Sequence, residues 1–156
     1  MLIDATYAGL MGGAADAPLV IPALNRDGDC LSDLVMPMFA SIAGAESVLL
    51  AFDANYEPLV AMAEAPHGTA PGLAGKDVAN PMAMLLSCAA ILHHGAQRGH
   101  GGTEQRSRAI YEAVMETTAA GVCTPDLGGH ASSTQVTDDV VRRVGIKLAA
   151  QRPRGA

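Results

Sequence analysis

The sequence lacks the features that mark a nucleic-acid-binding domain. It has no tryptophan, two phenylalanines and three tyrosines among 156 residues, and 10 Lys and Arg against 16 Asp and Glu give a net charge of −6. A nucleic-acid-binding domain usually carries a basic patch and aromatic side chains on which bases stack. We therefore expect no nucleic-acid partner.

Long hydrophobic runs and a basic N-terminus are also missing. The longest apolar run, residues 82–92, has 11 residues and is interrupted by Ser87, whereas a membrane-spanning helix needs about 20 apolar residues. The N-terminus carries Asp4 and no early Lys or Arg, unlike a secretory signal peptide. We therefore expect no membrane partner and a cytoplasmic location.

Cysteine is scarce and its pattern is uninformative about metals. Cys30, Cys88 and Cys123 are widely spaced and form no CxxC motif. An odd number of isolated cysteines argues against a disulfide framework or a zinc site. We expect them to be small buried side chains in a reducing compartment.

The sequence does contain enough apolar material for a folded core. Apolar residues make up 49% and charged residues 17% of the chain, which excludes an intrinsically disordered protein. We expect one structured region over residues 1–150 and a disordered tail over 151–156. The hydrophobic periodicities predict an α/β protein with short strands and several long helices. Helices are predicted over 2–11, 29–39, 80–94, 103–120 and 133–150, and strands over 18–24, 48–52 and 59–63.

Local signals predict where the long helices begin and end. Asn80 followed by Pro81 is typical of an N-cap and a first helical residue. Gly121 predicts the end of the preceding helix. Ser132 and Gln135 have the spacing of a capping box at the start of the last helix.

Two further segments carry structural expectations. Residues 25–28 are predicted to form a turn, and the helix that follows should kink or end near Met36 because Pro37 removes a backbone donor. The helix over 80–94 is apolar almost all round, which is typical of a helix buried in a core or a subunit interface. We therefore expect a homodimer or a higher oligomer.

Asp29 and Asp33 are the first candidate site residues. Their i,i+4 spacing places both carboxylates on one face of a helix. Two carboxylates within reach of each other repel unless a cation or a proton lies between them, and a hard divalent cation such as Mg²⁺ suits such a pair. The alternative is an N-terminal aspartate that favours the helix dipole, followed by a solvent-facing one.

The second candidate is the loop over residues 66–81. It contains three prolines and three glycines in 16 residues, and long loops in compact domains are often functional. Glycines allow a ligand to approach the backbone, and the helix start that follows suits an anion. The alternative is a surface loop held by its prolines.

Several segments together resemble the isocitrate/isopropylmalate dehydrogenase family. They are 28–33 (Gly-Asp-Cys-Leu-Ser-Asp), 64–71 (Glu-Ala-Pro-His-Gly-Thr-Ala-Pro), 79–81 (Ala-Asn-Pro) and 124–129 (Thr-Pro-Asp-Leu-Gly-Gly). The resemblance runs from residue 2 to about residue 148. It implies part of that family's α/β fold and an oxidoreductase activity: NAD(P)-dependent, metal-requiring decarboxylation of 2-hydroxy acids.

The resemblance implies a metal site. Asp29 and Asp33 match two metal-ligating aspartates, and Asp4 matches a third that the family supplies across a dimer interface. The implied ion is Mg²⁺ or Mn²⁺. In the family this ion chelates the substrate's carboxylate and hydroxyl, which lowers the pKa of the hydroxyl and stabilises the enolate left after decarboxylation.

The resemblance also implies a cofactor site. Glu64 matches the glutamate that lies near the nicotinamide. The loop that wraps the adenosine half of the cofactor is matched by His67, Gly68, Thr69, Ala70 and Asn80.

The sequence departs from the family in two respects. The family's chain is much longer, and its first half, with the substrate-binding arginines and the acid–base tyrosine and lysine, has no match here. The resemblance therefore implies the C-terminal part of such an enzyme, with a separate N-terminal half as a candidate partner. Gly72 stands where NAD-type members carry an aspartate and some NADP-type members a lysine. Pro125 and Gly129 stand where NADP-type isocitrate dehydrogenases place a tyrosine and an arginine, so the resemblance favours NAD and leaves NADP open.

Two functions of different classes follow. The first is the metal- and NAD(P)-binding part of a β-decarboxylating dehydrogenase, with a 2-hydroxy diacid of the isocitrate type as the favoured substrate. The second is a truncated, non-catalytic homologue that acts as a folding, dimerisation or binding module. Because the substrate-binding arginines and the acid–base pair have no match, we expect the lone chain to be inactive.

Overall fold

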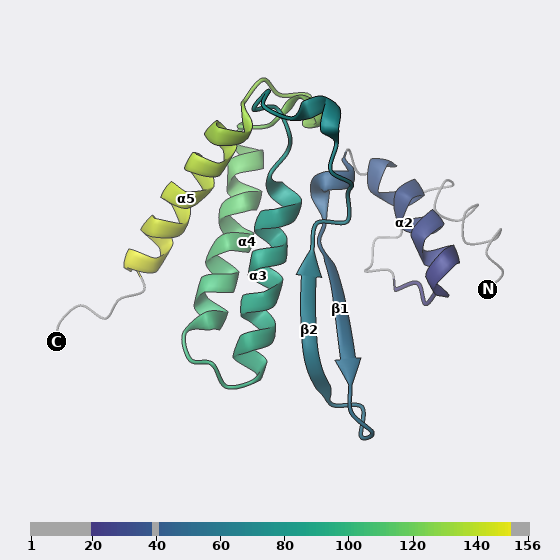
Figure 1. Ribbon diagram of the computed structural model, residues 1–156. Coiled ribbons are helices and arrows are strands. Elements are labelled where there is room, and N and C mark those ends of the chain that lie inside the picture. The colour runs from purple at the N-terminus through teal and green to yellow at the C-terminus, as the bar shows by residue number, and fades with distance from the viewer. Residues whose placement is uncertain (1–19, 39–40, 151–156) are drawn as a thin grey trace. The chain divides into compact units, whose positions relative to one another are not determined.

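The computed structural model describes residues 20–38 and 41–150 (Figure 1). Asp4, the helix expected over 2–11 and the tail expected over 151–156 lie outside the described residues. The chain divides into two compact units, residues 1–41 and 42–156. The described part is mostly helical with one two-stranded sheet, in agreement with the predicted short strands and long helices.

The first unit contains helix α2, Asn25–Met38, and corrects two expectations. Residues 20–24, predicted as the end of a strand, have no regular secondary structure. The turn expected at 25–28 is the first turn of the helix, because the N–H of Gly28 donates to the carbonyl oxygen of Leu24 at 2.7 Å. The helix ends at Met38, close to the end expected near Met36, and Pro37 lies in its last turn, where it removes one intrahelical hydrogen bond.

The second unit begins with an antiparallel hairpin. Strands β1, Ser47–Phe52, and β2, Pro58–Glu64, confirm the two predicted strands. Leu49 pairs with Met62, and the register shifts at a bulge between Ala51 and Phe52. The turn is held by Asp53, whose Oδ1 accepts hydrogen bonds from the N–H groups of Asn55 and Glu57 at 2.8 and 2.9 Å.

Three long helices follow the hairpin: α3, Met82–Gln97; α4, Thr103–Ala119; and α5, Ser133–Ala150. Helix α3 packs between β2 and α4, and α5 packs on α4 (Figure 1). The core lies where the three helices meet and is built from Leu86, Ala113, Val114 and Val140. None of the helices in the described part of the chain is long and apolar enough to cross a membrane.

The predicted helix ends are confirmed in their hydrogen bonds. The side chain of Asn80 accepts from the N–H of Met82 at 3.0 Å. Helix α4 ends at Ala119 with Ala120 as its C-cap, and the next residue, Gly121, has a φ of 79°, the left-handed conformation that glycine adopts freely. Ser132 and Gln135 form the reciprocal bonds of a capping box, at 2.8 and 3.2 Å.

The prediction of burial is wrong for two cysteines, and several other apolar side chains are exposed. Helix α3 was expected to be buried in a core or in a subunit interface, and within the single chain Met84 is 55% exposed and Ile91 39% exposed. On α5, Val141 is an apolar residue that is 61% exposed. Cys30 and Cys88 are also exposed, although Cys123 is buried and all three thiols are free. An apolar side chain therefore does not by itself indicate a buried face in this chain.

Candidate functional site

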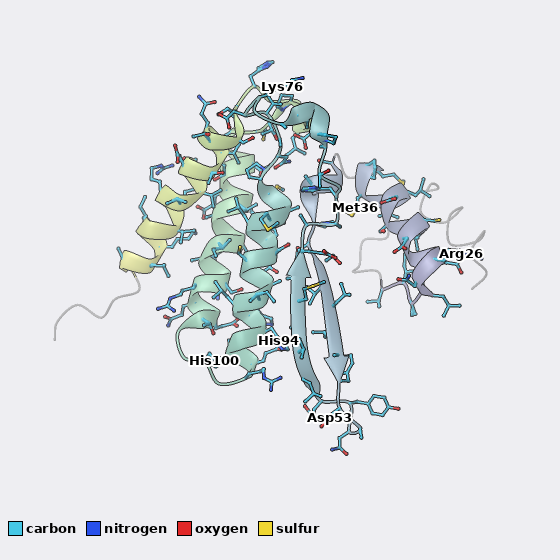
Figure 2. The ribbon with its side chains drawn as sticks, viewed as in Figure 1. Arg26, Met36, Asp53, Lys76, His94 and His100 are labelled. Carbon is cyan, nitrogen blue, oxygen red and sulfur yellow. The ribbon has the colours of Figure 1, made fainter. Side chains whose placement is uncertain are left out.

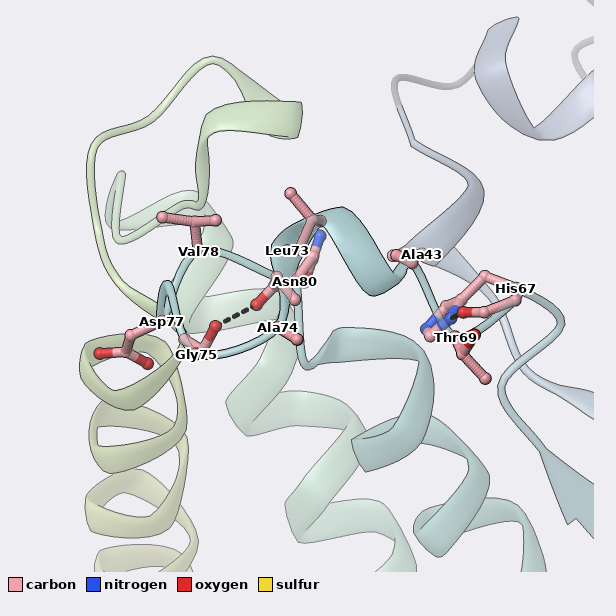
Figure 3. Close-up of a pocket in the computed structure, with 13 residues that line it drawn as sticks. Ala43, His67, Thr69, Leu73, Ala74, Gly75, Asp77, Val78 and Asn80 are labelled. Atoms are coloured by element: carbon pink, nitrogen blue, oxygen red, sulfur yellow. Dashed lines mark hydrogen bonds between the residues drawn. The ribbon is translucent and has the colours of Figure 1, made fainter.

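A pocket of about 670 Å³ lies along the loop between β2 and α3 (Figure 3). Five residues predicted to bind a cofactor contribute to its wall, namely His67, Gly68, Thr69, Ala70 and Asn80. The remaining lining residues are Ala43, Leu73, Ala74, Gly75, Asp77, Val78, Ala79 and Ser133. The sixth predicted residue, Glu64, is the exposed last residue of β2 and does not line the pocket.

The pocket exists because the loop turns back on itself. Ala70 adopts a left-handed conformation (φ 43°) and is followed by a single 3-10 turn over Pro71–Leu73. Gly75 and Asp77 are also left-handed, with φ of 73° and 54°. Such residues reverse the chain direction, so the beginning and the end of the loop line the same hollow.

His67 and Thr69 lie at one end of the pocket, and Asp77 and Val78 lie at the other (Figure 3). The Nδ1 atom of His67 is 3.0 Å from the carbonyl oxygen of Gly68. Because a carbonyl oxygen only accepts hydrogen bonds, Nδ1 is the donor in this contact, which leaves Nε2 as the ring atom that can accept a hydrogen bond from a ligand. The exposed imidazole thus offers one acceptor to a ligand.

Asp77 joins the loop to the start of α5. Its Oδ1 accepts hydrogen bonds from the backbone N–H and the hydroxyl of Thr134, at 3.0 and 2.9 Å. Its carbonyl oxygen accepts from the N–H of Ser133 at 2.9 Å. The hydrogen bonds from Ser132 and Thr134 hold the pKa of the Asp77 carboxyl below its usual range, so this residue is ionised at neutral pH.

Asn80 joins the other end of the loop to a distant turn. While its Oδ1 caps α3, its Nδ2 donates to Oδ2 of Asp126 at 2.9 Å. Asp126 also accepts from the hydroxyl of Thr124 at 2.5 Å. The Asn80 side chain is therefore committed to holding the loop, and a ligand would meet this residue chiefly through its backbone.

The predicted metal ligands lie in the other unit. Asp29 and Asp33 are exposed residues of α2, one helical turn apart, and neither forms an ion pair within the described part of the chain. Among residues 20–38 and 41–150, no three His, Cys, Asp or Glu side chains come together as a metal site. Asp4, the third predicted ligand, lies outside the described residues.

The sequence-based reasoning missed Asp77 and Ser133. Asp77 was recognised only as part of a loop, and Ser133 only as the start of a helix. The capping box at residues 132–135 marks the start of α5, but it does not reveal that a residue 57 positions earlier contacts that start. No local sequence signal carries this information.

Comparisons with known proteins agree with the motifs in the sequence. A model of the isocitrate/isopropylmalate dehydrogenase family matches residues 1–144. The 3-isopropylmalate dehydrogenase of Anaeromyxobacter dehalogenans is 32% identical over 92% of this chain and 38% of its own. Subunit 2 of the mitochondrial NAD isocitrate dehydrogenase of Kluyveromyces lactis is 39% identical over 81% of this chain and 32% of its own.

A solved structure shares the fold. The apo β-decarboxylating dehydrogenase of Thermococcus kodakarensis superposes with a TM-score of 0.64 and 27% identity, over 85% of this chain and 36% of that one. The chain therefore spans little more than a third of the length of the relatives it matches. Because the family model covers nearly the whole of this sequence, the chain belongs to the isocitrate/isopropylmalate dehydrogenase family.

Proposed function

We propose that this chain is the part of a β-decarboxylating dehydrogenase that holds the adenosine half of NAD and contributes ligands to a divalent metal ion. The observation that carries the proposal is the pocket of the 67–80 loop, which gathers five residues assigned to the cofactor from the sequence. Its volume of about 670 Å³ lies within the range of about 300–1,000 Å³ that is usual for small-molecule sites.

The chemistry of the wall fits an adenosine group. The lining consists largely of glycine, alanine and backbone, which permits close approach of a flat ring. A Cβ built on Gly68 or Gly75 would meet no atom within 4 Å, so neither position is filled by the protein itself. The acceptor on His67 and the hydroxyl of Thr69 are polar groups that would orient such a ligand.

The charge of the wall favours NAD over NADP. Among the described residues, no Lys or Arg lines the pocket, whereas the ionised Asp77 does. NADP carries an additional phosphate on its adenosine ribose, and a phosphate without a cationic partner beside a carboxylate is repelled. The NAD preference proposed from the sequence thus has a second, electrostatic support.

The metal ligands fit in kind but are incomplete in number. Carboxylate oxygens suit Mg²⁺ or Mn²⁺, and Asp29 and Asp33 are two unpaired carboxylates on one helical face among the described residues. Two carboxylates leave most of the coordination sphere to water, to a substrate or to Asp4. Once bound, the ion and NAD would supply charge stabilisation and a hydride acceptor, respectively.

The proposed substrate is a 2-hydroxy diacid of the isocitrate type, and we further propose a cytoplasmic location and a homodimer. A second candidate is a non-catalytic folding, dimerisation or binding module. It is the alternative for a chain in which the family's substrate-binding arginines and acid–base pair have no match. The two candidates predict different results when a partner supplies the acid–base residues. A dehydrogenase part should then turn over substrate, because general acid–base catalysis alone increases the rate by about 10²–10⁴-fold, whereas a non-catalytic module should not.

The binding experiment is calorimetric titration with NAD and, separately, NADP. We expect NAD to bind and NADP to bind more weakly. The variant Gly68→Phe places a large side chain at the wall and should abolish binding, whereas Gly101→Phe, which also has open space around it but lies outside the pocket, should not. Equal binding by the Gly68→Phe variant and the unaltered chain would contradict the proposal.

The catalytic experiment follows absorbance of reduced cofactor in the presence of Mn²⁺ and each of several 2-hydroxy diacids. We expect no turnover by the lone chain and turnover when it is co-expressed with the N-terminal half of a family member. Absence of turnover with every partner half would favour the non-catalytic module, and rapid turnover by the lone chain would contradict the expected dependence on a second half.

A further inference from the structure

The first turn of α5 is capped in an unusual way. Helices begin with N–H groups that have no partner within the helix, and a residue directly before the helix usually satisfies them. Here Ser132 takes part of that role, accepting from the N–H groups of Gln135 and Val136 at 3.2 and 3.0 Å. The N–H groups of Ser133 and Thr134 are instead satisfied by Asp77 of the pocket loop, through its carbonyl oxygen and its carboxylate.

The contact constrains the loop as well as the helix. Asp77 is one of three non-glycine residues with positive φ in the described part of the chain, at 54°. Aspartate tolerates this conformation better than most residues, but it still costs free energy relative to glycine. The hydrogen bonds to Thr134 offset that cost. A further bond, from the Ser133 hydroxyl to the carbonyl oxygen of Ala79, holds the segment that follows.

Asp77 and Ser133 both line the pocket, so the start of α5 forms part of its wall. In Figure 3 the Asp77 carboxylate is directed toward α5. Its Oδ1 is occupied by two hydrogen bonds from Thr134. Besides the negative charge that it places in the wall, the carboxylate therefore acts on the helix, and through this contact it would affect a ligand by the shape of the loop.

We propose that Asp77 is a positioning residue that couples occupancy of the pocket to the N-terminal turn of α5. The inference rests on the proposed nucleotide site and adds to it a specific mechanical link. When a ligand fixes the loop, Asp77 is held against Thr134, and the first turn of α5 opens less often. By thermodynamic reciprocity, a firmly capped α5 increases the affinity of the pocket by the same factor.

The test combines hydrogen exchange with ligand titration. Amide exchange at Thr134 is measured by NMR in the unaltered chain and in the variants Asp77→Ala, Asp77→Asn and Asp77→Gly, each with and without NAD. The matched control is Asp138→Ala, which removes a carboxylate from α5 that has no hydrogen bond or ion pair among the described residues. The NAD dissociation constant of each protein is determined by calorimetry.

We expect Asp77→Ala to accelerate exchange at Thr134 and to weaken NAD binding, each by at least about tenfold, because the variant removes both hydrogen bonds from Thr134 to a charged group. Asp77→Asn, which keeps an oxygen acceptor, should restore much of both properties. Asp77→Gly also removes the carboxylate, but glycine adopts the positive φ without strain. We therefore expect this variant to fold even if the alanine variant does not. Adding NAD to the unaltered chain should slow exchange at Thr134, which a purely structural cap would not produce.

The outcomes separate the two proposals. If NAD fails to bind the unaltered chain, the proposed function is wrong and the coupling falls with it, while exchange in the free variants still decides whether Asp77 caps α5. If NAD binds but does not alter exchange at Thr134, the coupling is wrong and the proposed function stands. Weaker NAD binding in Asp77→Ala with unchanged exchange would instead make Asp77 a direct ligand contact.

Discussion

Asn80 shows how a single side chain can join two structural tasks. Its amide oxygen caps α3 and its amide nitrogen donates to Asp126, 46 residues further along the chain. The cap orients the helix, and the second bond fixes the end of the pocket loop. Any substitution at this position therefore affects helix and loop together, but not necessarily to the same degree.

Substitutions at Asn80 should separate the two tasks. Asn80→Ala removes both hydrogen bonds and should lower the free energy of unfolding by about 1–2 kcal/mol. Asn80→Asp keeps an acceptor for the Met82 N–H but loses the donor and places a second carboxylate beside Asp126, so NAD binding should suffer more than stability. Urea unfolding and NAD titration of both variants provide the measurement. An alanine variant as stable as the unaltered chain would contradict the cap.

The metal proposal is testable on α2. Mn²⁺ should bind weakly, since two carboxylates provide few of its ligands. Because removal of an outer-shell partner alone often costs about 10–100-fold in metal affinity, Asp29→Asn should weaken binding by at least about tenfold. Asp27→Asn is the matched control, because Asp27 lies on the same helix and pairs with Arg26 at 3.7 Å. Equal heats for the two variants would remove the assignment.

Sequence patterns predicted the structural role of a residue where its hydrogen-bond partner lies nearby in the chain. Asn80 and the Ser132–Gln135 box were identified because a cap and its helix are neighbours in sequence. The predicted pocket residues from His67 to Ala70 came from a resemblance of motifs, and their gathering around one pocket needed the folded chain. The role of Asp77 was not predictable, because its partner lies 57 residues away.

At the scale of elements, α4 and α5 are joined by a network of charged side chains. Asp139 accepts from Arg143 at 2.6 Å, from Arg142, and from the hydroxyl of Thr117 at 2.9 Å. Lys147 reaches back to α4 and donates to Glu112 and Glu116 at 2.9 and 2.6 Å. Isolated surface ion pairs contribute little, but a network that shares side chains costs less entropy per bond.

The network should make stability depend on acidic pH. The pKa of Asp139 is lowered chiefly by Arg143, that of Glu112 by Arg108, and that of Glu116 by Lys147. A carboxyl group whose pKa is lower in the folded chain than in the unfolded chain, where it is about 4, stabilises the fold at pH values above about 4. This stabilisation is lost as the pH falls through the pKa of the folded chain. The urea midpoint should therefore decrease from pH 5 to pH 2.

The variant Asp139→Asn should be less stable at pH 7 and should show a shallower decrease toward low pH. Asp138→Asn, the adjacent residue of α5, should keep the full dependence. Identical pH profiles for Asp139→Asn and the unaltered chain would show that the network contributes nothing to stability. Arg143 and Arg142 both contact Asp139, at i+4 and i+3, although Asp138 has the i,i+4 spacing from Arg142, because sequence spacing alone does not distinguish i,i+3 from i,i+4 partners.

At the scale of the whole molecule, the hairpin presents an unusually apolar surface. The register places Leu49 and Ala51 on the same face as their partners Met62 and Val60. Leu49 is 52% exposed, Met62 47% and Val60 61%. Strands that are apolar on both faces are typical of sheets covered on both sides, whereas among the described residues of the second unit α3 is the helix that packs on this hairpin.

This surface should cause self-association at micromolar concentration, since contiguous exposed apolar patches usually mark interfaces. Light scattering should detect a dimer or a higher oligomer. The variant Val60→Lys should raise the dissociation constant of this oligomer by at least about tenfold. Met115→Lys is the matched control, because Met115 is 66% exposed on α4, away from the hairpin. A clean monomer for the unaltered chain would contradict the expectation.

The separation between the loop and its anchors also has a consequence for the order of folding. The hairpin is made of neighbouring residues, and α3 and α4 are joined by a short turn (Figure 2, which labels His94 and His100 near that turn). Contacts of such short range form early. The anchors of the 67–80 loop, at Asp126 and Thr134, are 46 and 57 residues from their partners. We therefore expect the pocket to be assembled later than the hairpin and the α3–α4 pair, and a kinetic probe at His67 should report a later phase of folding than a probe in the hairpin.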